Sequence, residues 1–502
     1  MTQTKTTRGP DPVSASGPGV LTATGANQLA RGTLTTWDAV AISVSVLAPG
    51  MAMFLNVPGV AAVAGGSTPL SFLLGGVGIL ALAFVVIGFT RRMASAGYAY
   101  TYASRSIGKE GGFVAGWLYA FGLSCFVPMT MAGTAALAVN LLGLDPKLWF
   151  LFFLIGMALL VTLSIIAIRV TTRVQLLVGA ITVAVIVVVD VITTAKGGAG
   201  GNTVQPFTFG HTISGGFNGV FYGIILGVTS YIGFETAADF GEETDNPRRS
   251  IPIAIIAATG FAIVFYLFTT YAMTVGFGVD NAAFGSDAFA LKTVAKNFVG
   301  GPFPQLVEIG GMLSAFIVCL ACATAAARTL FAMGREGVMP RWFGKTNARF
   351  RTPANATLTV AGISTVLAAL VGYLWSQDAF GGAPQTVYFF FATLGTLGVI
   401  LVYIMLCLGG MAFFRRTKAS YNVLLHAVVP LIGAVIFGAA FYGSVYPQPP
   451  FPLNLTPYIT AAWLVIGIVA VVVLRSQNPA AVERIGSILG EEGGEDAKLL
   501  SA

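Results

Sequence analysis

The sequence predicts an all-α membrane protein with twelve transmembrane helices. Only 9% of its 502 residues are charged, whereas soluble proteins carry about 25%. Hydrophobic residues make up 56% of the chain, which argues against a soluble fold. The chain also contains long stretches without Asp, Glu, Lys or Arg. We interpret each as one or two membrane helices, because about 20 apolar residues span a bilayer.

Ten charge-free stretches account for the twelve helices. They are 39–90, 111–144, 148–168, 174–189, 197–234, 250–279, 309–327, 352–377, 379–414 and 419–474. The first and the last are long enough for two helices each, and we expect them to divide at 65–69 (GGSTP) and 446–450 (YPQPP), where Gly and Pro interrupt a helix. Most stretches do not alternate polar and apolar residues, which argues against a lipid-facing barrel.

The basic residues predict the orientation in the membrane. With twelve helices, 23 of the 27 Lys and Arg residues fall on the side of the termini, and four fall on the other side: Lys147, Lys196, Lys292 and Lys296. Cytoplasmic loops are enriched in Lys and Arg, so we expect a multi-pass protein of the cell (plasma or inner) membrane with both termini in the cytoplasm. No loop has the dense basic patch with aromatic residues that would indicate nucleic-acid binding.

Three regions follow from this count. Residues 1–36 are polar and rich in Thr, Gly and Pro, and we expect a disordered cytoplasmic N-terminus. Residues 37–475 form the helical domain. Residues 476–502 form a cytoplasmic tail that ends in a Gly- and Glu-rich segment.

Two of the predicted helices contain an interruption. In the first helix, SVLAPGM (45–51) places Pro49 beside Gly50, which removes an amide donor and adds a permissive backbone. In the sixth helix, TSYIGFE (229–235) places Gly233 two residues before Glu235. Breaks five helices apart are expected of an inverted repeat of five plus five helices whose discontinuous helices meet at the membrane centre. The alternative is that these residues only kink packed helices.

The chemistry of such breaks suits a zwitterion. Amides at the start of a second half-helix favour an anion, and released carbonyls of the first half favour a cation. Glu235 lies near mid-depth, where a carboxylate is costly and marks a candidate functional site. We expect it to carry a proton or to contact a substrate amine; a structural carboxylate hydrogen-bonded to helix ends fits equally. No metal or cofactor is expected, since Cys319 and Cys322 lack further ligands nearby.

Three stretches resemble a known family. GFETAADFGEETDNPRRSIP (233–252), ARTLFAMGREGVMP (327–340) and AGYAYTYASRSIGKEGGFVAGW (96–117) are similar to signatures of the amino acid-polyamine-organocation (APC) superfamily of permeases. The resemblance covers roughly 34–474. It implies the leucine-transporter-like fold, in which helices one to five and six to ten are inverted repeats and helices eleven and twelve are peripheral.

The resemblance also implies a binding site at the two breaks. The amides of Gly50 and Met51 would meet a substrate carboxylate. Carbonyls near Ala48, Tyr231 and Ile232 would meet its ammonium group. Glu235 matches a position that is often acidic in the family and is linked there to proton or gate coupling.

The sequence departs from the family pattern in three places. Pro49 stands in a loop that is usually Gly-Ser-Gly-like, so it supplies one donor fewer. Thr229 stands where several members carry an aromatic gate, which leaves either Tyr231 or Phe234 as a substitute, or a weaker gate. The fifth helix has no Lys for coupling and has Thr182 at that place. Sodium ligands are the less favoured alternative and would come from hydroxyl groups of the eighth helix, at Ser314 and Thr324.

These observations predict a secondary active transporter that moves amino acids or related amines by alternating access. Proton symport through Glu235 is the preferred coupling, with amino acid or amine exchange as the alternative. A membrane-embedded transferase is the alternative from another class. The expected lining of Thr229, Phe234, Thr393 and Thr396 favours neutral substrates over dibasic ones. The sequence leaves the oligomeric state open.

Overall fold

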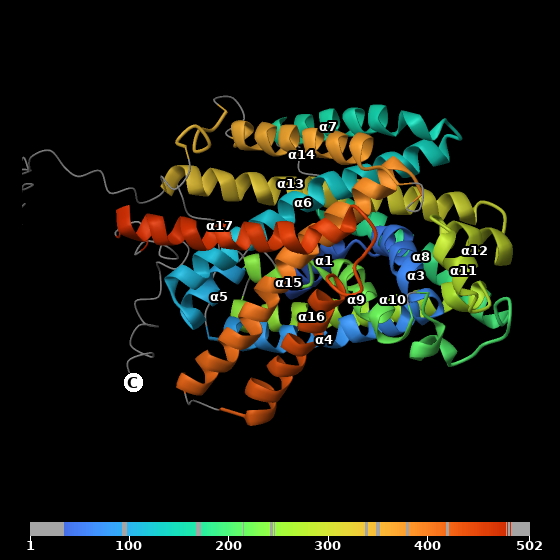
Figure 1. Cartoon of the computed structure of the whole chain (residues 1–502), viewed down its shortest axis with the longest axis horizontal. Helices are drawn as coiled ribbons and strands as arrows, with labels where there is room; N and C mark the ends of the chain where they lie inside the picture. Colours follow the sequence, from blue (N-terminus) through green and yellow to red (C-terminus); the bar gives the residue numbers. More distant parts are fainter. Residues whose placement is uncertain are drawn as a thin grey trace, which may run out of the picture.

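The computed structural model describes residues 35–92, 98–166, 172–213, 215–240, 244, 246–336, 340–347, 352–377, 381–417, 421–477, 479 and 482. These residues form helices, turns and loops, and no β-strand occurs among them. Ten helical segments within this part of the chain are long and apolar enough to cross a membrane. Most helices run roughly along the long axis of the molecule (Figure 1). The expected terminal regions, 1–36 and 476–502, lie almost entirely outside the described residues.

The N-terminal half contains α1 (Thr36–Leu47), α2 (Pro49–Met51), the π-helical η1 (Ala52–Asn56), α3 (Val57–Ala64), α4 (Thr68–Thr90), α5 (Tyr98–Ile107), α6 (Lys109–Leu141), α7 (Trp149–Ile166), α8 (Thr172–Ala195) and α9 (Gly216–Tyr231). The C-terminal half contains η6 (Thr236–Phe240), α10 (Pro247–Gly276), α11 (Asn281–Ser286), α12 (Ala290–Phe298), α13 (Phe303–Glu336), α14 (Ala354–Leu374), α15 (Ala383–Thr417), η8 (Leu424–Val428), α16 (Val429–Gly443) and α17 (Thr456–Gln477).

Each charge-free stretch of the sequence overlaps at least one of these helices, and both expected divisions are found. The 3-10 turn η2 (Gly65–Ser67) separates α3 from α4, and turns between Gly443 and Leu453 separate α16 from α17. The stretch 197–234 differs from expectation, because its helix begins only at Gly216. Gly197, Gly198 and Gly201 have positive φ angles there, so the lack of charge reflected a glycine-rich loop and not a longer helix.

The helices differ in how much of their surface is buried. In α6, 78% of the most apolar window is buried within the protein, and in α15 the share is 67%. The corresponding share is 22% for the segments that contain α7, α16 and α17. Apolar side chains on these rim helices are exposed, among them Leu151, Val435 and Val465. The segment Thr36–Thr90, with α1 to α4, is 72% buried by the same measure. The centre of the molecule is therefore built around this segment, α6 and α15, and the rim presents an apolar surface suited to lipid.

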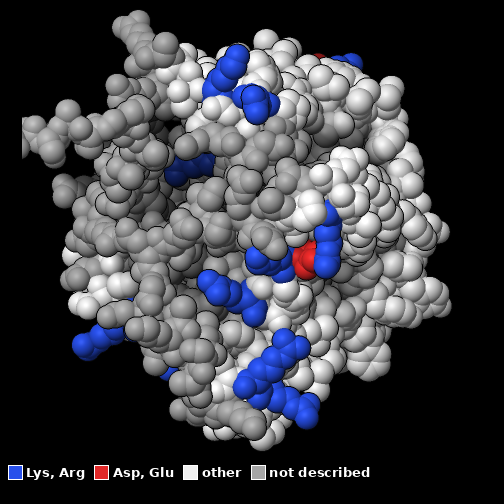
Figure 2. Space-filling view, turned by 90° about the vertical axis from the view of Figure 1, so that its left-hand side faces the viewer, with Lys and Arg blue, Asp and Glu red and all other residues white. Residues whose placement is uncertain are grey.

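The two ends of the helices carry different amounts of basic charge. Figure 2 looks onto the end where α4, α15 and α17 finish, and Lys and Arg side chains are scattered over the described part of that face. Arg92, Arg416 and Arg475 lie at these helix ends. The opposite end, near α12, carries Lys292 and Lys296.

Glycine residues allow α9 to pack closely inside this arrangement. A Cβ atom at Gly219 would lie 2.5 Å from the carbonyl oxygen of Val63 in α3. At Gly223 it would lie 2.6 Å from the hydroxyl oxygen of Ser71 in α4. Any larger side chain would push α9 away from α3 and α4, so these small residues fix the position of the helix that ends at the second break.

Candidate functional site

The first break lies between α1 and α2. Helix α1 ends at Leu47, and Ala48 adopts a left-handed conformation with φ 44° and ψ 60°. This conformation is unfavourable for a residue with a Cβ atom. Pro49 then begins α2 without an amide donor. The amides of Gly50 and Met51 come next, at the start of α2. In a continuous helix the carbonyls of the preceding turn would accept from them, whereas the break removes these acceptors.

The second break follows α9 and touches the first. Helix α9 ends at Tyr231, Ile232 is extended with ψ 129°, and Gly233 has φ 117°. Only glycine adopts such a φ value easily. A Cβ atom at Gly233 would lie 2.8 Å from Cγ1 of Val46 and 3.1 Å from the amide nitrogen of Leu47. Both predicted interruptions are therefore real breaks, and they are in direct contact.

Tyr266 of α10 joins the two breaks. Its hydroxyl group lies 3.1 Å from the carbonyl oxygen of Leu47 and 2.8 Å from that of Ser230. One hydroxyl therefore contacts backbone carbonyls in the last turns of two different helices, and its side chain is fully buried. The sequence reasoning missed this residue. A polar phenol within the apolar stretch 250–279 was the available signal.

The backbone carbonyls that we expected at an ammonium group are partly engaged. The carbonyl oxygen of Ala48 accepts from the amide of Ala52 at 3.0 Å, and that of Tyr231 accepts from Phe234 at 3.3 Å. Each keeps a second lone pair for another donor. The half-buried Ile232 lies in the extended link between α9 and Gly233.

Glu235 is fully buried, and both of its oxygen atoms accept hydrogen bonds. Oε1 accepts from the hydroxyl groups of Tyr119, at 3.2 Å, and Tyr403, at 2.9 Å. Oε2 accepts from the amide of Gly233 at 3.0 Å. The side chain therefore ties the second break to α6 and α15. The hydrogen bond to the amide of Gly233 fits the structural alternative, a carboxylate bonded near a helix end. The two phenol contacts fit the coupling alternative as well, because a proton on Glu235 would change both hydrogen bonds.

The positions considered for an aromatic gate point in different directions. The hydroxyl of Thr229 lies 2.6 Å from that of Thr396 in α15. The hydroxyl of Tyr231 donates to the carbonyl of Phe72 in α4 at 3.1 Å. Phe234 packs edge-on against Tyr403. Thr393 is fully buried on the same helix as Thr396.

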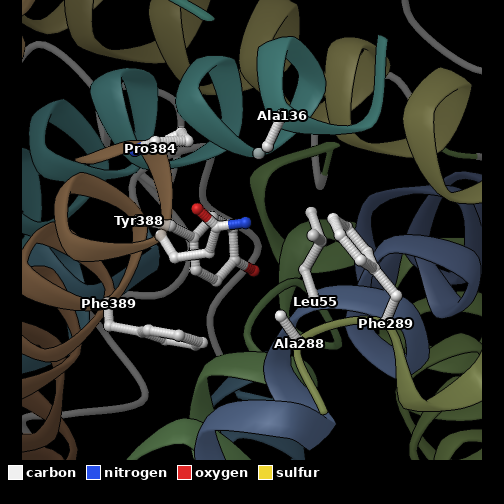
Figure 3. Close-up of a pocket in the computed structure, with 9 residues that line it drawn as sticks. Leu55, Ala136, Ala288, Phe289, Pro384, Tyr388 and Phe389 are labelled. Carbon is white, nitrogen blue, oxygen red and sulfur yellow. The ribbon is translucent and has the colours of Figure 1, made fainter. Parts of the chain in front are cut away.

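A second polar link crosses the site through Asn56, the last residue of η1. Its amide donates to the hydroxyl of Ser230 at 2.9 Å, and its carbonyl accepts from the hydroxyl of Tyr388 at 2.6 Å. Tyr388 also lines a small cavity of about 10 Å³, close to the smallest volume that holds one water molecule. Figure 3 shows Leu55 and Phe289 on one side of this cavity and Tyr388 on the other.

Three residues that are distant in the sequence, Gly50, Thr182 and Ser314, lie together beside the first break. A Cβ atom at Gly50 would lie 2.9 Å from Oγ of Ser314 in α13 and would also touch the methyl group of Thr182 in α8. Thr324 does not share this place, because ten residues along a helix amount to about 15 Å. Its hydroxyl bonds back to the carbonyl of Leu320 at 2.7 Å. Ser314 and Thr324 are therefore too far apart for both hydroxyl groups to contact a single ion.

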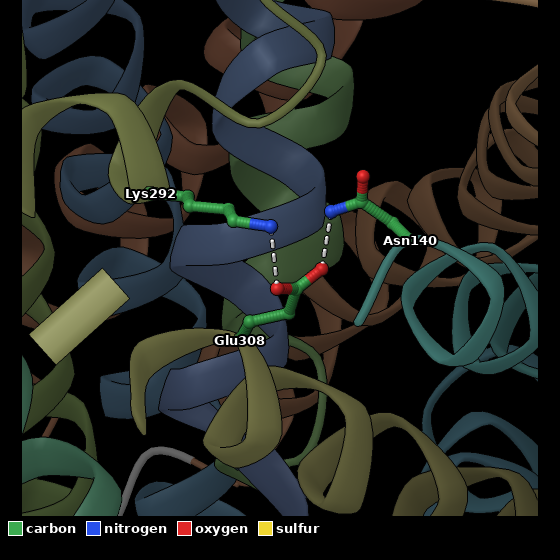
Figure 4. A network of polar contacts seen from close by, with 3 residues as sticks. All are labelled: Asn140, Lys292 and Glu308. Carbon is green, nitrogen blue, oxygen red and sulfur yellow. Dashed lines mark hydrogen bonds and ion pairs between the residues drawn. The ribbon is translucent and has the colours of Figure 1, made fainter. Parts of the chain in front are cut away.

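An ion pair lies at the end of the molecule that carries α12. Glu308 of α13 is fully buried and lies 2.7 Å from Nζ of Lys292 in α12. The amide of Asn140, near the end of α6, donates to its other oxygen. Figure 4 shows both partners reaching Glu308 from different helices. The contact fastens α12 to α13 and α6, next to the segment that supplies Phe289 to the cavity.

Comparisons with known proteins identify the family of the chain. The family model described as amino acid permease matches residues 34–474. The chain is 26% identical to a branched-chain amino acid permease of Lactococcus lactis over 87% of this chain and 92% of that protein. It is 26% identical to a methylthioribose transporter of Bacillus subtilis over 81% of this chain and 87% of that protein.

A further match is the low-affinity putrescine importer of Escherichia coli, which is 26% identical over 82% of this chain and 88% of its own length. The characterised relatives named here are transporters and not enzymes, which removes the transferase alternative. The family match covers nearly the whole helical part and includes all three motif stretches. The chain therefore belongs to the amino acid permeases of the amino acid-polyamine-organocation superfamily and is a multi-pass membrane transporter.

Proposed function

We propose that the protein is a proton-coupled symporter that carries neutral amino acids or related amines across the cell membrane by alternating access. The observation that supports this most directly is the contact of the two broken helices. A substrate at this contact faces the helix-start amides of Gly50 and Met51, which suit a carboxylate. The carbonyls around Ile232 suit its ammonium group.

We further propose twelve membrane spans arranged as a five-plus-five inverted repeat, with α16 and α17 outside it. Ten long apolar segments support this count when the 55-residue segment Thr36–Thr90 is counted as two spans and α9 as half of a broken one. The gathering of basic side chains at one end supports a cytoplasmic location for that end and for both termini.

Neutral substrates fit the side chains near the breaks. Thr229, Thr393 and Thr396 are buried and uncharged, so nothing in this set would pair with a second ammonium group. Because named relatives include a branched-chain amino acid permease, a methylthioribose transporter and a putrescine importer, these three substrate classes form the natural test panel.

Coupling through Glu235 is supported by its position. Its oxygens hold Tyr119 of α6, Tyr403 of α15 and the amide of Gly233 together. Protonation removes the negative charge and turns one carboxylate oxygen into a donor, so the hydrogen bonds that Glu235 accepts become weaker. A proton at this place would therefore loosen the second break from two central helices.

The direct test is uptake into proteoliposomes that contain the purified protein. Labelled leucine, putrescine and methylthioribose are offered with an inward proton gradient, with an inward sodium gradient and with unlabelled substrate inside. We expect accumulation of the neutral amino acid driven by the proton gradient alone. Uptake that requires internal substrate indicates exchange instead, and uptake of none of the three contradicts the proposed substrate class.

The coupling residue is tested with Glu235→Gln, and Glu110→Gln serves as the matched control. Glu110 is an exposed carboxylate of α6 that pairs with Arg475 at 2.5 Å. We expect the Glu235 variant to lose the dependence of uptake on external pH and the Glu110 variant to keep it. An unchanged pH profile in the Glu235 variant removes this residue from coupling.

A further inference from the structure

A second buried carboxyl group lies in α8, away from both breaks. Asp190 is fully buried. Its Oδ2 accepts from the hydroxyl of Thr269 in α10 at 2.6 Å. Its Oδ1 is buried and has no hydrogen-bond partner in the described part of the chain. The hydroxyl of Thr193, one turn further along α8, is buried and unpartnered as well.

The three fully buried carboxyl groups of the described residues differ in the number and kind of hydrogen-bond donors that they receive. Glu235 receives two hydroxyl donors and one amide. Glu308 receives an ammonium group and an amide. Asp190 receives one hydroxyl. A buried charge needs compensating partners, whereas a protonated carboxyl group carries no charge. The surroundings of Asp190 therefore suit a group that is protonated during part of the transport cycle.

Among the described side chains of the neighbouring helices, no charged group compensates Asp190. The helices packed against α8 are α1, α2, α10, α12 and α13. Their described charged or titratable side chains are Asp38, Arg248, Arg249, Tyr266, Tyr271, Lys292, Lys296, Glu308, Cys319, Cys322 and Arg328. None of them forms a hydrogen bond or ion pair with Asp190, whose one hydrogen-bond partner is Thr269.

Thr269 connects this carboxyl group to the breaks. It lies three residues after Tyr266 on α10, about 4.5 Å along the helix axis. Tyr266 is the residue whose hydroxyl serves the carbonyls of Leu47 and Ser230. Helix α8 reaches the first break independently, through the contact between Thr182 and Gly50. A change in the contact between Asp190 and Thr269 thus acts on two helices that both touch the broken segments.

We propose that Asp190 is a second proton-binding site of the transport cycle, placed between α8 and α10 on the α12 side of the breaks. The proposal rests on the proton coupling proposed above. The carboxylate takes up a proton on Oδ1, and the neutral carboxyl group gives it back when the transporter returns. Thr269 is a positioning residue that holds Oδ2 toward α10.

The protonation itself is measured without transport. The protein is produced with carbon-13 in the side-chain carboxyl of aspartate and purified. Infrared difference spectra are recorded when the substrate identified by the uptake panel is added. If the panel identifies no substrate, the spectra are recorded when the pH is changed. The pH stays where exposed aspartates are ionised. We expect a band of a protonated carboxyl that shifts with the aspartate label and is absent in Asp190→Asn. The same band should remain in Asp145→Asn, a control at an exposed loop position.

A conservative variant covers the case in which Asp190→Asn does not fold. In Asp190→Glu the band should lose its sensitivity to labelled aspartate and gain sensitivity to labelled glutamate. A band that does not shift with labelled aspartate in the unsubstituted protein overturns the proposal, and so does an aspartate-sensitive band that persists in both Asp190 variants. The infrared spectra detect a bound proton and not transport. They therefore test Asp190 even if uptake does not depend on the proton gradient. Uptake without such dependence would contradict the proposed proton coupling but not the protonation of Asp190.

Uptake measurements then connect the site to the cycle. In Asp190→Asn we expect accumulation driven by the proton gradient to be lost while exchange of internal for external substrate continues. Thr269→Val should shift the pH profile of uptake, and Thr269→Ser should restore it because serine keeps the hydroxyl donor. A valine variant with the wild-type pH profile contradicts the positioning role.

Discussion

The hydroxyl group of Tyr266 lies 2.8 Å from the carbonyl oxygen of Ser230, one residue before α9 ends. The same hydroxyl lies 3.1 Å from the carbonyl of Leu47, where α1 ends. One side chain of α10 therefore holds two helix ends that come from distant parts of the sequence. A movement of either half-helix changes a contact shared by both.

Removing this hydroxyl should loosen the breaks. In Tyr266→Phe we expect a loss of about 1–3 kcal/mol of stability, because a buried carbonyl loses its donor, together with reduced uptake. Tyr231→Phe is the control, since its hydroxyl reaches a single carbonyl, that of Phe72. Thermal unfolding and uptake in proteoliposomes measure the two effects. Equal uptake by both variants would contradict a special role for Tyr266.

A side chain at Gly233 should prevent the breaks from meeting. Gly233→Ala places a Cβ atom 2.8 Å from Val46 at a φ of 117°, and we expect a cost of at least about 1–2 kcal/mol with loss of transport. Gly260→Ala is the control, because its added Cβ meets nothing within 4 Å and alanine favours a helix by up to about 1 kcal/mol. Transport by the Gly233 variant at the level of the Gly260 variant would refute this expectation.

The ion pair at the α12 end should matter more than the exposed pair at the other end. Lys292→Met leaves the buried carboxylate of Glu308 without its cation, and we expect a loss of about 3–5 kcal/mol. Arg475→Met breaks an exposed pair with Glu110, and we expect at most about 1 kcal/mol. The double variant Lys292→Met, Glu308→Gln should recover most of the loss. Similar melting temperatures for the two single variants would show that burial of Glu308 is unimportant.

Asn56 and Tyr388 should be energetically coupled. Their side chains share a buried hydrogen bond of 2.6 Å. A double-mutant cycle with Asn56→Ala and Tyr388→Phe should give a coupling of about 0.5–3 kcal/mol, as expected of residues in one hydrogen-bond network. Denaturant unfolding of the four proteins in detergent measures it. Additive losses would mean that the bond contributes nothing beyond packing.

The sequence predicts those features that depend on local chemistry. Pro49 and Gly233 impose their breaks through backbone geometry, and neighbouring residues suffice to recognise them. Glu235 is recognised because a carboxylate in an apolar helix is rare. Its partners are not local: Tyr119 lies 116 residues away and Tyr403 168 residues away.

Tyr266 and Asn56 show the limit of such reasoning. Each is a polar residue in an apolar stretch, and the stretch itself does not say toward which neighbour the side chain turns. That direction follows from the packing of α10 and η1 against several other helices. The extent of the glycine-rich loop before Gly216 was missed for a related reason, since an uncharged loop and an uncharged helix look alike when only charge is counted.

The amide of Gly233 is bound by the carboxylate of Glu235, two residues further along the same chain. The chain thus supplies its own anion to a helix end that a ligand would otherwise have to fill. The break that follows α9 is consequently held by groups of the chain itself, so a ligand does not have to unwind a helix there. Binding free energy that unwinding would consume therefore remains available for the other contacts of a ligand at this break.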